Sequence, residues 1–176
     1  MIRKILTGNN KILRTPSKEV VFPLSKEAKE SLEDLLETVK TQKDPEGQGL
    51  AAPQIGKSLG IFVMQKDKVY REAINPKIIK KSKETNFFTL GKDKCILEGC
   101  LSVPDVYGEL ERPYKVEVTY FDKRGKEIKE TLEGMASICF QHEFDHLEGV
   151  LFIDKVLEQG GKLFEIEGEN WKEIIL

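Results

Sequence analysis

The first regular pattern along the chain is that of an amphipathic helix, which we predict for residues 25–40. Ser25 is a favourable N-cap, and Pro45 lies beyond the predicted C-terminal end. Apolar side chains recur every three or four residues between these positions, so one face of the helix would pack against a core. These apolar positions are Ala28, Leu32, Leu35, Leu36 and Val39.

Two extended segments are predicted after a glycine-rich turn. LGIFVMQ at residues 59–65 is a short apolar run bounded by turn residues, which is typical of a buried strand. The second segment passes through Ala73 and Ile74. We expect Asn75 and Pro76 to end it, because proline cannot donate a hydrogen bond to a strand ladder.

The second half of the chain changes from a period of two to a helical period. VEVTYF and KEIKETL flank a short turn at residues 122–125 and predict a β-hairpin. Residues 134–147 predict a helix, which Gly149 closes just past its C-terminus. KLFEIEG at residues 162–168 predicts a brief strand, whereas the final ENWKEIIL has no clear pattern.

These elements indicate an α+β fold, with antiparallel or mixed sheets packed around a central buried helix. A chain of 176 residues can form one domain with a sizeable core, so we expect residues 1–176 to be a single domain. Hydrophobic residues make up 39% and charged residues 33%, with a formal net charge of -2. This balance is typical of a soluble globular protein and gives no signal for nucleic acid or membrane binding.

The cysteines and the first residues bear on the cellular compartment. No apolar stretch in the first sixteen residues is longer than two, so we expect no secretory signal there. Cys95, Cys100 and Cys139 are too few and too irregular for a disulfide framework. We therefore expect free thiols in a reducing cytoplasm, available for packing or for metal binding.

QHEFDHLEG at residues 141–149 contains both histidines of the chain. Residues four apart on a helix lie on one face with a rise of about 6 Å, so His142 and His146 can converge on one metal ion. Glu143 lies about 100° round the helix from His142, near enough to act as a general base. This is the HExxH arrangement of two ligands and a base. The alternative is a pair of hydrogen-bonded histidines on a partly buried helix.

The remaining side chains of this helix predict a buried setting. Met135, Ile138 and Cys139 share the face of the histidines, and other apolar residues widen that face. We therefore expect the helix to be covered on most sides. Its narrow polar stripe consists of Gln141, Asp145 and Glu148.

A catalytic metal site of this kind needs a third protein ligand. Cys139 lies seven residues before His146, a helical rise of about 10.5 Å, which two metal bonds cannot span. Cys95 and Cys100 remain as candidates. Gly99 permits a close approach of the backbone, which favours Cys100 without excluding Cys95.

Three motifs resemble, in order and approximate spacing, the signature motifs of peptide deformylases. They are GQGLAAPQ at residues 47–54, EGCLS at residues 98–102 and QHEFDHLEG, and the leader NKILRTPSKEV is similar to the family too. The resemblance covers most of the chain. It implies a single catalytic domain that removes the formyl group from the N-terminal formylmethionine of newly made polypeptides.

The resemblance implies that Cys100, His142 and His146 hold one divalent metal ion. That ion is typically Fe²⁺ in active family members, with Zn²⁺, Ni²⁺ or Co²⁺ found in isolated ones. Glu143 would be the general base and later the acid. Gln54 and the backbone N–H of Leu101 would then bind the oxyanion.

Substrate binding is implied at two further places. Gly49 and Gly99 would offer backbone groups to the main chain of the substrate. The methionine side chain needs an apolar pocket, for which Met135, Ile138 and Cys139 on the buried helix are suitable lining.

The chain departs from the family pattern at three places. Gln48 stands where the family usually has an aliphatic residue, at the rim of the expected cleft. Residues 85–97 are longer than the corresponding connection in compact bacterial members, and we expect an extra loop there that includes Cys95. The short tail after Asp154 lacks the long basic helix with which some members dock on the ribosome, so we expect any ribosome association to be weak or to use another surface.

Two other functions fit parts of the sequence. A zinc endopeptidase would share HExxH but should have a glutamate or histidine as its third ligand. A catalytically silent relative would bind peptides without turnover, and it would be expected to lose Glu143, Gln54 or a metal ligand.

Overall fold

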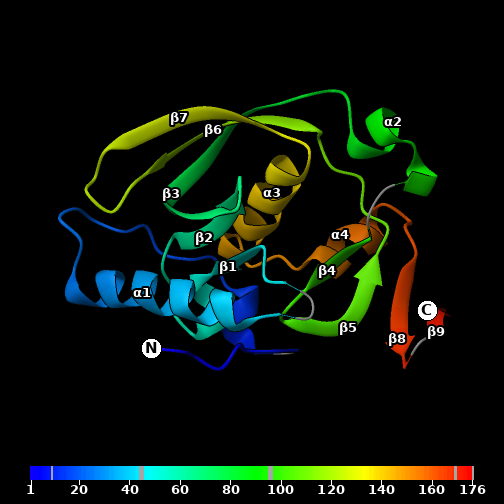
Figure 1. The fold of residues 1–176 in the computed structure, drawn as a ribbon, viewed down its shortest axis with the longest axis horizontal. Helices are drawn as coiled ribbons and strands as arrows, with labels where there is room; N and C mark the ends of the chain where they lie inside the picture. Colours follow the sequence, from blue (N-terminus) through cyan, green and yellow to red (C-terminus); the bar gives the residue numbers. More distant parts are fainter. Residues whose placement is uncertain (9, 44–45, 95–96, 169, 176) are drawn as a thin grey trace.

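The strands form two antiparallel sheets in a computed structural model, which describes residues 1–8, 10–43, 46–94, 97–168 and 170–175 (Figure 1). The strand order of the first sheet is β1-β2-β3-β6-β7, and that of the second is β4-β5-β8-β9. The predicted α+β class is therefore confirmed. The first sheet comprises β1 (Gly49–Ala51), β2 (Ile61–Lys66), β3 (Val69–Lys81), β6 (Lys115–Phe121) and β7 (Glu127–Glu133), and the second comprises β4 (Glu98–Cys100), β5 (Val103–Gly108), β8 (Leu163–Glu167) and β9 (Asn170–Ile174).

Four α-helices and three short 3-10 helices accompany the sheets in the described ranges. None of these helices is long and apolar enough to cross a membrane. The α-helices are α1 (Lys26–Thr41), α2 (Asn86–Leu90), α3 (Met135–Leu147) and α4 (Phe152–Glu158), and the 3-10 helices are η1 (Lys11–Arg14), η2 (Ala52–Ile55) and η3 (Lys92–Lys94).

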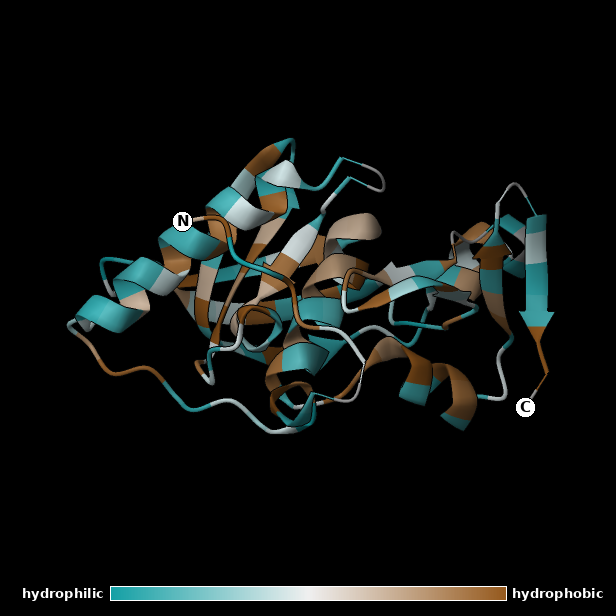
Figure 2. Cartoon of the chain, turned by 90° about the horizontal axis from the view of Figure 1, so that it is seen from below, coloured by the Kyte–Doolittle hydropathy of each residue, from teal (hydrophilic) through white to brown (hydrophobic). Residues whose placement is uncertain are grey.

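Helix α1 covers one face of the five-stranded sheet, as its predicted apolar stripe requires. The Ser25 side chain accepts a hydrogen bond from the backbone N–H of Ala28 and caps the helix. Leu32, Leu35 and Val39 are buried in a cluster with side chains of β1 and β2. In Figure 2 hydrophobic and hydrophilic positions alternate along this helix, in agreement with one face on the core.

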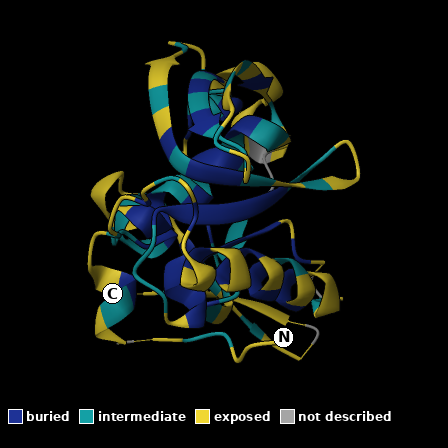
Figure 3. Ribbon diagram, turned by 90° about the vertical axis from the view of Figure 1, so that its left-hand side faces the viewer, coloured by how far each residue is buried: buried dark blue, intermediate teal, exposed yellow. Residues whose placement is uncertain are grey.

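Helix α3 packs against the opposite face of the same sheet. Because side chains alternate along a strand, β2 directs Ile61 and Val63 toward α1 but Phe62 toward α3. The rings of Phe62 and Phe140 meet edge to face, with centroids 5.1 Å apart. The sheet is thus covered on both faces, and Figure 3 shows the buried positions concentrated in the middle of the molecule.

Strand β3 continues through Asn75 and Pro76, so the prediction that these two residues end it was wrong. Asn75 has a left-handed backbone (φ 48), and its side chain bonds both the N–H and the C=O of Val20 at 2.8 and 2.7 Å. The pairing of β3 with β6 shifts register between Ile74 and Lys77. Pro76 therefore lies in a β-bulge, where its missing N–H interrupts no ladder bond.

The other predicted strands are confirmed, and the tail is resolved as a hairpin. Strands β6 and β7 pair in register from Lys115–Glu133 to Phe121–Glu127 around the predicted turn. Strand β8 pairs with β9, whose residues show no clear pattern in the sequence and were not assigned to a strand. This pairing places the C-terminal segment on the edge of the second sheet (Figure 1).

The segment 85–97, expected to be a loop, contains the short helices α2 and η3. Thr85 caps α2 by accepting a hydrogen bond from the N–H of Phe88. The buried side chain of Asn86 donates to the C=O of Leu110 and accepts from the N–H of Arg112. This segment therefore holds the backbone at Leu110 and Arg112 in place. Cys95, which was expected to lie in the loop, is outside the described residues.

Candidate metal centre and active site

Helix α3 carries His142, Glu143 and His146 between two glycines with positive φ. Gly134 precedes the first turn (φ 59), and Gly149 lies just past the last turn (φ 74), as predicted. The two imidazole rings lie one turn apart, with centroids 4.9 Å from each other. The helix thus holds both rings on one face, where they can address one point.

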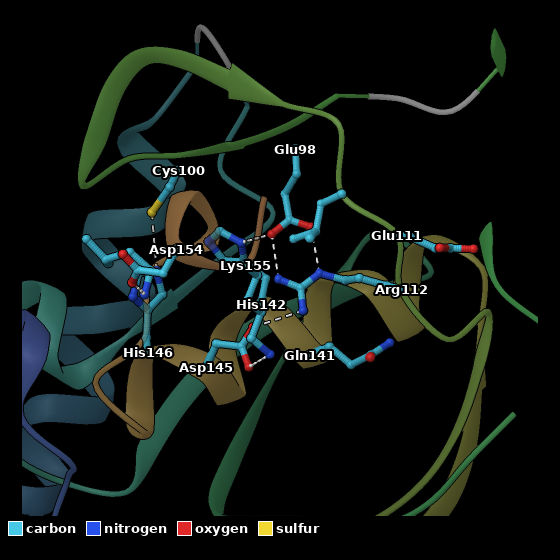
Figure 4. A network of polar contacts seen from close by, with 12 residues as sticks. Glu98, Cys100, Glu111, Arg112, Gln141, His142, Asp145, His146, Asp154 and Lys155 are labelled. Carbon is cyan, nitrogen blue, oxygen red and sulfur yellow. Dashed lines mark hydrogen bonds and ion pairs between the residues drawn. The ribbon is translucent and has the colours of Figure 1, made fainter. Parts of the chain in front are cut away.

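Cys100 reaches the two histidines from the edge of the second sheet (Figure 4). Its Sγ lies 3.2 Å from Nε2 of His146, and the ligand atoms of all three residues lie within 4.8 Å of one another. The pairing of β4 with β5 shifts register between Gly99 and Cys100, and this irregularity turns the thiol out of the regular strand. Cys139 does not belong to this group, in agreement with its exclusion on helical rise.

The donor set fits a divalent transition metal. One thiolate and two imidazoles are the ligand types of zinc and of ferrous iron. His142 directs Nδ1 to Oε1 of Glu98 at 2.7 Å, which leaves Nε2 as the atom available for a metal. Burial opposes the charged form of His142, but Cys100 and Glu98 outweigh it and raise its pKa well above 6.5. Cys100 and the Glu98 carboxylate therefore favour positive charge beside His142, and a bound metal cation would supply that charge.

A buried ionic network holds Glu98 in place (Figure 4). The Arg112 guanidinium donates two hydrogen bonds of 2.7 Å to the carboxylate of Glu98 and one of 2.9 Å to Asp145. Lys155 donates to the other oxygen of Asp145 at 2.7 Å. Burial works against the charge of Glu98, but Arg112 overcomes it and lowers the pKa of Glu98 to about 2.

The polar stripe predicted for α3 is mostly buried rather than solvated. Asp145 belongs to the network around Arg112, and Gln141 donates to the C=O of Pro113 and to Ser137. Of the three residues in the stripe, only Glu148, just past the C-terminal end of the helix, is exposed. Helix α3 is therefore buried on more of its surface than its polar stripe indicated.

Glu143 is buried against strand β1. A Cβ on Gly49 would overlap the Glu143 carboxylate, so only glycine allows the strand to approach this closely. Oε2 of Glu143 has no hydrogen-bond partner among the described residues. Burial raises the pKa of Glu143 to about 7. A carboxyl with such a pKa can both accept and release a proton near neutrality.

Gln54 points its side-chain amide at the candidate metal centre. Its Oε1 accepts from the N–H of Ala51 at 2.8 Å, and its Nε2 lies 3.1 Å from Oγ of Ser102 and 3.7 Å from Sγ of Cys100. Leu101 lies between these two contacts in sequence, and its N–H bonds no other described residue. Two donors are thus available beside Cys100.

Two of the three predicted methionine-pocket residues line a cavity of about 460 Å³, which reaches α3 at Cys139, about one turn before the candidate ligand His142. Met135 and Cys139 contribute to this cavity, and so does Gln48, whereas Ile138 does not. Burial raises the pKa of the Cys139 thiol well above its ordinary value, so it is a neutral lining group. The second predicted substrate glycine, Gly99, packs against Tyr107, whose ring would lie 2.7 Å from an added Cβ.

The supporting network was missed by reasoning from the sequence. Glu98 had a usable signal, because it lies two residues before Cys100 within the EGCLS motif. Arg112 had none, since it follows no motif and its three partners come from distant parts of the chain.

Comparisons with known proteins agree on one family. A family model described as polypeptide deformylase matches residues 2–161. Peptide deformylase from Fusobacterium nucleatum is 38% identical over 175 residues, which cover 98% of this chain and 94% of that protein. Peptide deformylase from Pseudothermotoga lettingae is 42% identical over 156 residues, covering 89% and 84%.

Solved structures give the same result. Peptide deformylase from Thermotoga maritima is 36% identical with a TM-score of 0.77, and the match covers 89% of this chain and 98% of that one. A class I type b peptide deformylase from Acinetobacter baumannii bound to Met-Ala-Ser is 25% identical with a TM-score of 0.75, covering 89% and 99%. The chain therefore belongs to the peptide deformylase family of metal-dependent enzymes, which remove the formyl group from the N-terminal formylmethionine of polypeptides.

Proposed function

We propose that this chain deformylates formylmethionyl peptides with one divalent metal ion held by Cys100, His142 and His146, and with Glu143 as the proton carrier. One observation carries this assignment. Three ligand atoms within 4.8 Å of one another lie beside a buried carboxyl that has an unpaired oxygen and a pKa of about 7. We propose Fe²⁺ as the ion in the cell, with Zn²⁺, Ni²⁺ or Co²⁺ as alternatives in isolated protein.

The bound ion would supply Lewis acidity, which polarises the formyl carbonyl and makes the attacking water a stronger acid at neutral pH. Glu143 takes the proton from that water and later delivers it to the departing amine. The side-chain amide of Gln54 and the backbone N–H of Leu101 donate hydrogen bonds to the oxygen on which negative charge develops. Burial of Glu143 and Gln54 excludes competing solvent from these groups.

The main chain of the substrate lies between Gly49 and Gly99 in this proposal. Both glycines are on edge strands, β1 and β4, whose outer backbone groups can pair with an extended peptide. The Acinetobacter baumannii relative bound to Met-Ala-Ser supports a short peptide as substrate. We propose that Met135, Ile138 and Cys139 receive the methionine side chain, although Ile138 is not among the residues that line the cavity.

The two other functions have less support. A zinc endopeptidase would need a glutamate or histidine third ligand, whereas Cys100 is the residue that meets the histidine pair. A silent relative would have lost part of the chemistry, yet Glu143, Gln54 and the three candidate ligands are all present. We further propose that residues 1–176 act as one catalytic domain in the cytoplasm on nascent polypeptides, with a weak association with the ribosome.

An assay under anaerobic conditions tests the proposed reaction. Protein purified with ferrous iron is expected to release formate from formyl-Met-Ala-Ser and to leave the unformylated peptide intact. Metal analysis of the same material identifies the ion. Cleavage of an internal peptide bond with the formyl group retained would instead indicate an endopeptidase.

Replacing Cys100 by serine is expected to weaken metal binding by more than the roughly 10- to 100-fold that is typical for loss of a supporting residue. Serine is a poor ligand for soft transition metals because its hydroxyl stays protonated. Chelator competition measures the affinity, and the thiolate-to-metal absorption of cobalt-loaded protein reports the sulfur ligand directly.

Cys139→Ser is the matched control, because this thiol lies on α3 outside the ligand group. It should keep both the affinity and the thiolate absorption. Cys95→Ser is predicted from the sequence to keep them as well. Loss of the absorption in either control, with retention in Cys100→Ser, would reassign the third ligand.

A further inference from the structure

The cavity that reaches α3 at Cys139 is larger than a single methionine side chain requires. Its volume of about 460 Å³ lies within the range of sites that bind whole small molecules. The walls are formed by the start of β1, by the β2–β3 turn, and by the end of β7 together with the start of α3. The lining residues are Gln48, Gln65, Lys66, Asp67, Thr131, Leu132, Glu133, Met135, Ala136 and Cys139.

The wall formed by α3 is apolar, and the opposite wall is polar. Met135 is 52% exposed although it lies in the first turn of a helix that is otherwise largely buried. Gln48, which directly precedes β1, and Asp67, in the β2–β3 turn, line the same cavity as Met135. One wall therefore suits the methionine of a substrate, while the outer wall suits something polar.

The polar wall offers acceptors and little available positive charge. The ammonium of Lys66 pairs with the carboxylate of Glu130, which also accepts from the hydroxyl of Tyr120 at 2.6 Å. Glu133 pairs with Lys115 at 2.5 Å, and both side chains are about half exposed. Asp67 forms no ion pair with any described residue. Lys66 and Glu133, the other charged residues that line the cavity, are both paired, so the charge of Asp67 is not balanced by a neighbouring side chain.

The edge of β1 connects this cavity to the reacting centre. Gly49 lies against Glu143, and Gln48 directly precedes it in the chain. The C=O of Gln48 accepts from the N–H of Gln65 at 2.7 Å, which fixes Gln48 against the strand that leads into the β2–β3 turn. A peptide that pairs with β1 at Gly49 is thereby led past Gln48 toward Asp67.

We propose that this cavity receives a residue that follows the formylmethionine, and that Asp67 makes the enzyme prefer a cationic side chain there. The inference rests on the proposed function, because it needs the formyl group at the metal centre. Asp67 has a left-handed backbone (φ 53) in the tight β2–β3 turn, so its position is fixed by the hairpin. The carboxylate is exposed, which limits the preference to about threefold to fivefold in kcat/KM.

The test compares two series of amidated peptides, formyl-Met-Xaa-Ala and formyl-Met-Ala-Xaa, with lysine, glutamine or glutamate at Xaa. In one of the series kcat/KM is expected to be about threefold to fivefold higher for lysine than for glutamate at low salt. The ratio should fall toward one in 1 M salt, where the Debye length is about 3 Å. In Asp67→Asn, which keeps a side chain that tolerates the left-handed backbone, the ratio should approach one at low salt.

Glu127→Gln is the control for net charge. It removes one carboxylate from the far end of β7, about 20 Å along the strand from Glu133, and should keep the wild-type ratio. A ratio near one in the wild type, or an unchanged ratio in Asp67→Asn, would overturn the inference while the glutamine peptides still report deformylation. Failure to deformylate the glutamine peptides would instead overturn the proposed function, and the inference with it.

Discussion

Glu143→Ala is expected to abolish deformylation while the protein keeps its metal. General acid–base catalysis by a positioned side chain is worth about 10²- to 10⁴-fold in rate, and Glu143 would act in both proton transfers. The three candidate ligands are untouched by the change, so the metal content should stay at the wild-type level. Formate release from formyl-Met-Ala-Ser and metal analysis of one preparation measure the two quantities together.

Two further variants make the result specific to the proton. Glu143→Gln preserves the shape that packs against Gly49 and should lose activity equally, because an amide cannot carry the proton. Glu148→Ala removes an exposed carboxylate from the end of the same helix and should stay active. A Glu143→Gln variant with near wild-type turnover would transfer the proton-carrying role to another group.

The elements that the sequence predicted correctly are those whose signal is local. The amphipathic stripe and the Ser25 cap of α1 lie within sixteen residues, and the two histidines of α3 are related by the geometry of a single turn. Strand β3 was predicted too short because the feature that accommodates Pro76 is not local. Asn75 is held by Val20, 55 residues away, and the bulge exists only in the pairing with β6.

The residues of the candidate site also divide into those with a local sequence signal and those without one. His142, Glu143 and His146 follow from spacing, and the resemblance to a family placed Cys100 and Gln54 beside them. The residues that support the ligands could not be found by spacing, since Glu98, Arg112 and Asp145 come from three separate elements. Asp145 was assigned to a polar stripe of α3. The sequence alone does not show that the buried Arg112 packs against this stripe and donates to Asp145.

Replacing Arg112 by methionine is expected to destabilise the protein by about 3 to 5 kcal/mol at pH 7. Removing one partner of a buried ion pair leaves the other charge without compensation, and here two carboxylates, Glu98 and Asp145, lose their shared partner. Methionine fills a similar volume, so the loss reports charge rather than a cavity. Arg124→Met, at an exposed turn where the arginine pairs with Asp122, should change the stability by less than about 1 kcal/mol.

The pH dependence identifies the charge as the cause. The pKa of Glu98 is about 2 in the folded protein and 4.5 ordinarily, so its ionised form stabilises the fold above about pH 4.5 and loses this effect as the pH falls toward 2. In Arg112→Met the same carboxyl is buried without a partner and takes up a proton more readily. The difference in unfolding free energy between wild type and variant should therefore shrink between pH 7 and pH 3 in urea titrations.

The same variant separates support of the metal from support of the fold. Glu98 orients the His142 ring through Nδ1, and Arg112 orients Glu98, so metal affinity should fall about 10- to 100-fold even where the variant is folded. Chelator competition at 10 °C, with folding verified by circular dichroism, measures this effect. An Arg112→Met protein as stable as Arg124→Met at pH 7 would show that the two carboxylates do not depend on this guanidinium. A stable fold with unchanged metal affinity would remove Arg112 from the positioning of His142 altogether.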